Sequence, residues 1–177
     1  MSIPIRNADR SHVLANDRTF FVTSSISGKR GLLQSARSAG LLIDVLYHYR
    51  KHQKYLLHEF VIMPDHFHVL ITLRSEMTVE KAAQLIKGGF ASRAGRELGF
   101  HTPVWQKGFS EIRVTTSDSF LRLREYIQAN PGKRFLVATP EQYPYSSAFP
   151  KFELDAPPQR LKPFLDQSFG GIAEAMP

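Results

Sequence analysis

Two histidines, His66 and His68, stand on either side of one apolar residue in a segment rich in β-forming residues. The pattern predicts two strands separated by a turn at Pro64 and Asp65. Side chains alternate between the faces of a strand, so both imidazoles point to the same side. The residues between and after them face the opposite side, which we predict to be the core: Phe67, Val69 and Ile71. Parallel imidazoles on a rigid strand can bind a metal ion, although two strand histidines without a metal fit the same spacing.

A tyrosine and an asparagine further along the chain could complete this site. Tyr126 and Asn130 are four residues apart in a segment with helical spacing, so they share one helix face. If this helix crosses the open face of the sheet, Asn130 can add a carbonyl oxygen to the two imidazoles, and Tyr126 stands beside the metal. Taken singly, Tyr126 could pack in the core, and Asn130 could be a helix-terminal residue before Pro131.

This set of groups suits the cutting of a phosphodiester bond. A divalent cation neutralises charge on the phosphate as a Lewis acid, and a tyrosine oxygen can attack to form a covalent intermediate. A phenol with an ordinary pKa near 10 is a weak nucleophile at neutral pH. The cation would therefore assist by stabilising charge in the transition state.

The elements that must position these groups follow a regular order. Strands are predicted at residues 19–26, 55–63, 66–73 and 111–115, and helices at 32–53, 78–98 and 120–130, the last stopped by Pro131. Thr78 and Gly99 are predicted to cap the middle helix. The order predicts an α+β fold, the ferredoxin-like split βαβ pattern: an antiparallel sheet, helices on one face and a C-terminal catalytic helix. We expect one domain at residues 1–149 and a tail at 150–177.

The composition of the 177 residues narrows the class of protein. Twenty-three basic against 16 acidic residues give a net charge of +7, which is typical of a nucleic-acid-binding protein and also of some basic proteins without that role. There is no cysteine, which excludes disulfides and thiolate metal sites. No apolar run reaches membrane-spanning length. We expect a cytoplasmic, nucleoid-associated protein without a membrane partner.

The residues in five segments resemble the single-tyrosine HUH transposases, and among them the REP-associated tyrosine transposases, of the IS200-like family. The matching segments are residues 19–23, 61–72, 104–109, 126–131 and 143–148. Residues 63–68, followed far downstream by 126–131, are specific only in combination. Residues 108–111 depart from the family's pattern, so the resemblance gives no role to Glu111.

The resemblance implies a mechanism and a substrate. His66, His68 and Asn130 would bind Mg²⁺ or Mn²⁺, and Tyr126 would be the nucleophile. The substrate would be single-stranded DNA beside an imperfect palindromic hairpin, and the enzyme would be a monomer or a homodimer. Basic residues beside aromatic ones suit single-strand binding, and the candidates are Lys107, Phe109, Lys133 and Arg134. Trp105 could join them, although a core position is the more common role for tryptophan.

Two other functions fit the same residues. One is a domesticated regulator that binds hairpin DNA without useful cleavage. The other is a metal-dependent nuclease that uses water as its nucleophile. Detection of a covalent protein–DNA adduct would separate the transposase from both.

Overall fold

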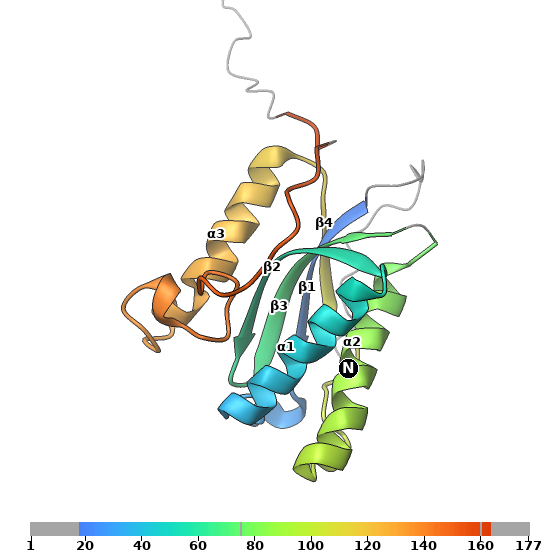
Figure 1. The fold of residues 1–177 in the computed structure, drawn as a ribbon, viewed down its shortest axis with the longest axis vertical. Coiled ribbons are helices and arrows are strands. Elements are labelled where there is room, and N and C mark those ends of the chain that lie inside the picture. The colour runs from blue at the N-terminus through green and yellow to red at the C-terminus, as the bar shows by residue number, and fades with distance from the viewer. Residues whose placement is uncertain (1–17, 75, 160, 164–177) are drawn as a thin grey trace, which may run out of the picture.

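A computed structural model describes residues 18–74, 76–159 and 161–163 of the chain, and its elements are shown in Figure 1. Four strands and three α-helices follow one another in the order predicted from the sequence. They are β1 (Arg18–Ser25), α1 (Ala36–Lys51), β2 (Tyr55–Met63), β3 (His66–Leu73), α2 (Val79–Leu98), β4 (Ser110–Val114) and α3 (Ser117–Lys133), with two short 3₁₀ turns at Ser27–Lys29 and Pro140–Gln142.

The strands form one antiparallel sheet in the order β2-β3-β1-β4. The two central strands, β1 and β3, are neighbours in the sheet although α1 and β2 separate them in the sequence. This is the ferredoxin-like arrangement. The α+β fold predicted from the sequence is confirmed. Helices α1 and α2 lie side by side on one face of the sheet, and α3 lies on the other (Figure 1).

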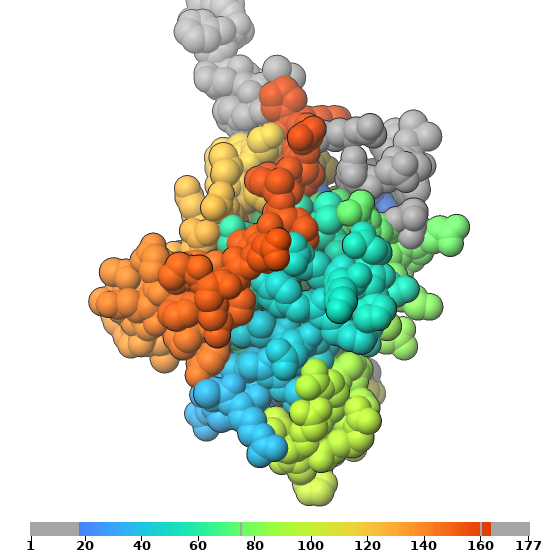
Figure 2. Space-filling model, in the orientation of Figure 1, coloured from blue at the N-terminus to red at the C-terminus, as the bar shows by residue number. Residues whose placement is uncertain are grey.

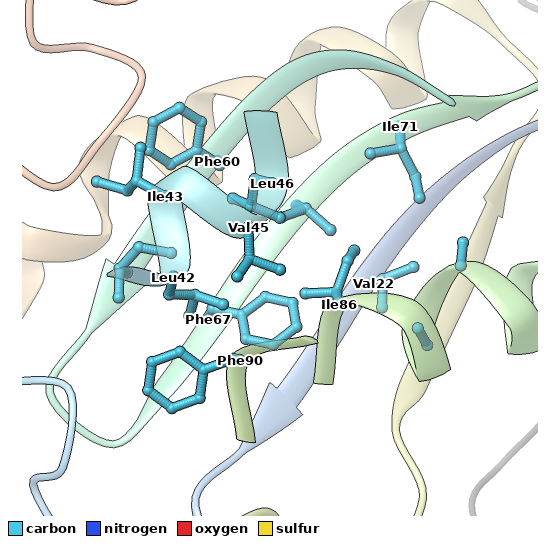
Figure 3. Packing of buried hydrophobic residues seen from close by; sticks show 14 of the residues in the cluster. Val22, Leu42, Ile43, Val45, Leu46, Phe60, Phe67, Ile71, Ile86 and Phe90 are labelled. Carbon is cyan, nitrogen blue, oxygen red and sulfur yellow. The ribbon is translucent and has the colours of Figure 1, made fainter. Parts of the chain in front are cut away.

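The main core lies between the sheet and helices α1 and α2. Figure 3 shows side chains from both helices and from three strands meeting there. Phe67, Val69 and Ile71 are fully buried in this core, as the alternation in β3 predicted. At Gly89 in α2, a Cβ atom would lie 3.1 Å from the Tyr49 ring. The glycine therefore lets α1 and α2 approach closely.

A second, smaller core fixes α3 to the opposite face of the sheet. Phe120 and Ile127 of α3 are buried against residues of β1, β2 and β3. This contact places α3 over the sheet face that the sequence analysis predicted to be uncovered by the first two helices. It also determines which α3 side chains reach β3. The second core also holds Phe21, Val61, Met63, Leu70, Val114 and Tyr143.

The ends of α2 lie where the sequence analysis predicted its capping residues. Thr78 accepts a hydrogen bond from the amide of Lys81 at 3.1 Å, and Gly99 adopts the left-handed conformation with φ 69°. The first helix begins later than residue 32, because Ser35 is its N-cap. Leu33 is still buried, so its apolar character indicated burial and not helix.

The prediction that Pro131 stops the last helix is wrong, because α3 continues to Lys133. Proline lacks one amide donor, but its fixed φ is compatible with helix. The turn after it closes through the amide of Arg134, which donates to Asn130 at 3.2 Å. The added residues include Lys133, which lies about two turns beyond Tyr126 on the same helix face.

The described part of the chain after residue 149 lies against the domain. In Figure 2 this segment, orange to red, runs over the surface toward the start of α3, where Lys162 pairs with Thr116. The Asp155 carboxylate accepts hydrogen bonds from the Arg50 guanidinium at 2.8 and 3.0 Å and from the amide of Leu57 at 2.8 Å. Residues 1–17, at the start of the predicted domain, and residues 164–177, in the second half of the predicted tail, lie outside the described residues. Among the described helices, none has the length and apolar character needed to cross a membrane.

Candidate active site

His66 and His68 lie on the face of the sheet that α3 covers. In the register of β1 and β3, His66 is opposite Ser25, His68 opposite Thr23 and Leu70 opposite Phe21. Leu70 and Phe21 belong to the α3-side core, which places both histidines on that side. Their ring centroids are 4.8 Å apart. Both are buried, with 7% and 5% of their surface exposed.

Hydrogen bonds at Nδ1 orient both rings. His66 Nδ1 lies 2.6 Å from Asp65 Oδ1, and His68 Nδ1 lies 2.6 Å from Thr23 Oγ1. A carboxylate accepts only, so the proton of His66 is on Nδ1 and its Nε2 carries a lone pair. His68 Nε2 is buried and has no hydrogen-bond partner among the described residues. Histidine ligands in metal sites are typically arranged this way, with the second nitrogen held by a neighbour.

Burial keeps both imidazoles neutral. It lowers the pKa of His66, against the opposing effect of the Asp65 carboxylate. Burial, together with the positive charges of His66, Arg134 and Lys29, lowers the pKa of His68 to about 3. Only a neutral imidazole can bind a metal, so the pair is ready for this role at neutral pH.

Tyr126 is held next to His68 by the packing of α3. Its ring centroid is 5.3 Å from that of His68 and 5.9 Å from that of Phe21. The Phe21 ring stacks on His68 at 5.1 Å. Tyr126 is 40% exposed, so it is not the core tyrosine of the alternative interpretation. An exposed phenol beside a buried histidine pair is accessible to a substrate.

Asn130 lies one helical turn beyond Tyr126 and is buried, with 6% of its surface exposed. Among the described residues, no group of three His, Cys, Asp or Glu side chains gathers to hold a metal. A third protein ligand would therefore come from another residue type, and the Asn130 carbonyl oxygen is the kind of donor that Mg²⁺ and Mn²⁺ accept. The buried Nε2 of His68 without a partner fits such an ion.

Three basic side chains surround the histidines and the tyrosine. The Lys133 ammonium lies 5.4 Å from the Tyr126 ring centroid. Arg134 and Lys29 are close enough to lower the pKa of both histidines. Lys29 comes from the turn after β1, where its φ of 55° is left-handed, and its ammonium donates to Ser25 Oγ at 3.0 Å. Together they create a positive field suited to a phosphate group.

The other candidate DNA-binding residues lie in the loop before β4. Lys107 is exposed, and Phe109 is partly buried against the main core. Trp105 is a core residue: it is 9% exposed, packs on Phe67 and Phe90, and donates Nε1–H to Lys87 O at 2.8 Å. It is therefore not a platform for base stacking.

Glu111 lies on the opposite face of the sheet from the histidines. It pairs with Val22 in the register of β1 and β4, and Val22 belongs to the core beneath α1 and α2. Its carboxylate cannot join His66 and His68 in one metal site across the sheet.

Sequence reasoning missed the residues that support the site from neighbouring elements. Thr23 and Phe21 contact His68 from β1, and their alternation in a predicted strand could have indicated a shared face. Glu59 of β2 is 3% exposed and receives the Arg124 guanidinium of α3 at 2.8 Å. No sequence pattern connects these two residues, which are distant in the chain.

Comparison with known proteins identifies the family of the chain. The model of the family described as "Transposase IS200 like" matches residues 24–130, more than half of the 177 residues. The chain thus has the fold of a transposase. It belongs to the IS200-like transposase family. No curated protein matches the chain.

Two solved structures are similar in fold. One is a REP-associated tyrosine transposase bound to a REP hairpin, with 20% sequence identity and a TM-score of 0.64 over 78% of this chain and 81% of that chain. The other is a provisionally named transposase from Deinococcus radiodurans, with 17% identity and a TM-score of 0.51 over 69% of this chain and 95% of that chain. The described fold is therefore that of the REP-associated tyrosine transposases.

Proposed function

We propose that this protein cuts and rejoins single-stranded DNA beside a palindromic hairpin through a covalent bond between Tyr126 and a DNA 5′ phosphate. The observation that carries the proposal is the position of the exposed Tyr126 ring, 5.3 Å from the ring of His68. The buried Nε2 of that histidine has no partner among the described residues. A nucleophile and a candidate metal ligand thus meet at one place.

A divalent cation would be held by His66, His68 and Asn130. When bound, it would polarise the phosphoryl oxygens and reduce the charge that develops on them. Mg²⁺ and Mn²⁺ are the proposed ions, because a set of two imidazoles and one amide oxygen leaves positions open for phosphate oxygens.

The chemical step follows from the side chains of the chain. The Tyr126 oxygen attacks the phosphorus and loses its proton, a phosphotyrosine bond forms, and the P–O3′ bond breaks. The departing oxygen takes a proton and becomes a free DNA 3′-OH. Rejoining is the reverse step, in which a 3′-OH attacks the phosphotyrosine and restores the phenol. The energy of the broken bond is retained in the covalent intermediate, so no other energy source is needed.

The basic side chains around Tyr126 would hold the substrate. Lys133 and Arg134 follow Tyr126 at the end of α3, and Lys29 approaches from the turn after β1. A hairpin substrate is supported by the structural neighbour, which is bound to a REP hairpin. Since α3 packs on the sheet of its own chain, the tyrosine and the histidines of one chain would act together.

Replacement of Tyr126 by phenylalanine tests the nucleophile. Tyr126→Phe keeps the ring that packs on Phe21 and His68 but removes the attacking oxygen. Binding of hairpin DNA in a gel shift should remain nearly unchanged. Cleavage and the covalent adduct on a denaturing gel, with Mn²⁺ or Mg²⁺ present, should be lost together.

Tyr49→Phe is the matched control, since Tyr49 lies in α1 on the other side of the sheet. It should cut and form adduct like the wild type. A covalent adduct with Tyr126→Phe would show that another residue is the nucleophile. Cleavage by Tyr126→Phe without an adduct would indicate a nuclease that uses water.

A further inference from the structure

A pocket of about 410 Å³ opens between α3 and the β4 edge of the sheet, next to the proposed nucleophile. Two of the residues that line it, His68 and Tyr126, belong to the candidate active site. The volume lies near the lower end of the range of about 300–1,000 Å³ that is typical of small-ligand sites. The other lining residues come from β1, β4 and α3: Phe21, Thr23, Ser110, Ile112 and Leu123.

The pocket presents an apolar, partly aromatic wall to solvent. Ile112 and Tyr126 are 42% and 40% exposed, which is high for large apolar side chains at a concave site. Leu123 precedes Tyr126 by three residues in α3, so both project from one helix face. Among the residues that the structure describes, no Asp, Glu, Lys or Arg side chain lines the pocket. A flat and uncharged group therefore suits it.

Positive charge lies beside this neutral pocket. Lys133 is close to the Tyr126 ring, and Arg134 and Lys29 act on the neighbouring histidines. A nucleotide has the same division, a flat neutral base joined to an anionic phosphate. An uncharged peptide or a hydrocarbon chain would leave the adjacent cations without a counterpart.

We propose that this pocket binds one unpaired nucleobase adjoining the phosphodiester that Tyr126 attacks. The proposal rests on the function proposed above and names the part of the DNA that the site holds beside the scissile bond. The base stacks against the wall formed by Ile112, Leu123 and the Tyr126 ring. The Ser110 hydroxyl at the exposed rim can exchange a hydrogen bond with the edge of the base. Seating the base brings its phosphate to the tyrosine oxygen, so the pocket sets which bond is cut.

The test is a binding measurement without cleavage. The probes are two hairpin oligonucleotides with unpaired flanks, one flank made of thymidines and the other of abasic residues with the same phosphates. Stacking on side chains is sequence-tolerant, so thymidine is a sufficient probe. With EDTA present, the wild type should bind the thymidine flank at least about fivefold more tightly, since stacking of one base has roughly this effect or more.

Two variants assign that preference to the pocket. Ile112→Ser should bind both probes with nearly equal affinity, because it removes the wall and leaves the phosphate contacts. Leu123→Ser is a second variant with the same expectation. Leu121→Ser is the matched control, since Leu121 is 52% exposed on the same helix and does not line the pocket. It should keep the full preference for thymidine.

The outcomes separate the pocket from the cleavage chemistry. Equal wild-type affinity for both probes would overturn the base pocket, even if Tyr126 forms an adduct. A preference that survives in both Ile112→Ser and Leu123→Ser would overturn it too. A preference lost only in these variants would support the pocket, even if no adduct were ever detected.

Discussion

Removal of Arg124 should destabilise the protein more than removal of Arg122, although both arginines lie on α3. The Arg124 guanidinium lies 2.8 Å from Glu59, whose side chain is 3% exposed on the sheet face beneath the helix. Arg122 also pairs at 2.8 Å, with Asp118 one turn earlier, but its side chain is 73% exposed. The two arginines therefore offer the same substitution in a buried and in an exposed ion pair.

The magnitude follows from what each change leaves behind. Breaking a fully buried pair costs about 3–5 kcal/mol, because a charge stays in the interior without its partner. Arg124 is itself 46% exposed, and Ser147 and Gln128 still donate to Glu59. We therefore expect Arg124→Ala to lower the free energy of unfolding by about 2 kcal/mol. Arg122→Ala should change it by less than about 0.5 kcal/mol, as is usual for an exposed pair.

A double-mutant cycle isolates the pair. Glu59→Gln keeps the shape of the side chain and leaves Arg124 free to reach water, so its cost should be only about 1 kcal/mol. After Glu59→Gln, the additional effect of Arg124→Ala should be much smaller than in the wild type. Urea unfolding followed by circular dichroism gives each free energy.

The same cycle reports on the active site. Arg124 and Gln128 attach one flank of α3 to β2, while Tyr126 lies on the flank that faces His68. Loss of the contact between α3 and β2 should shift Tyr126 relative to His68. Arg124→Ala should therefore slow adduct formation, and Arg122→Ala should not. Both variants lose one positive charge, which makes them equal in their long-range effect on DNA binding. Equal unfolding free energies for Arg124→Ala and Arg122→Ala would refute the buried-pair reasoning.

Two further predictions concern stability. Without divalent cations, His68 should make the free energy of unfolding fall by about 2–3 kcal/mol from pH 7 to 4.5. The unfolded imidazole takes a proton near pH 6.5, whereas the buried imidazole does not, because desolvation and neighbouring positive charges lower its pKa to about 3. In urea titrations at each pH, His68→Gln should show a clearly weaker pH dependence of the unfolding free energy, and an unchanged dependence would contradict the prediction. Gly88→Ala should raise the free energy of unfolding by up to about 1 kcal/mol through helix propensity, because nothing lies within 4 Å of the new Cβ. Gly89→Ala should lack this gain in stability, because its Cβ would lie 3.1–3.2 Å from Tyr49 and Val45. Equal melting temperatures of the two variants would exclude close packing of α1 on α2 at Gly89.

The sequence alone determined the order of helices and strands and the two halves of the candidate site, which are the histidine pair of β3 and the tyrosine–asparagine pair of α3. The alternation around His66 and His68 predicted a strand with both imidazoles on one face, and the register confirms it. Thr78 and Gly99 marked the ends of α2 because a capping side chain and a left-handed glycine act locally. Such features depend on a few neighbouring residues, so they can be inferred without the fold.

Tertiary structure alone decided how the halves meet. That Tyr126 lies beside His68 depends on the docking of α3 by Phe120 and Ile127, and this packing joins residues far apart in the chain. The helix runs past Pro131 because the following turn closes with its own hydrogen bonds. A local rule for proline does not include that compensation.

The register between the paired strands likewise lies beyond the sequence. Thr23 orients His68, and Glu111 falls on the opposite face, because β1 lies between β3 and β4 in the sheet. Each strand pattern fixes which residues share a face, but which residues lie opposite one another on neighbouring strands is set by the packing of all elements together. For this protein, local patterns therefore specify the chemical groups, and global packing specifies their neighbours.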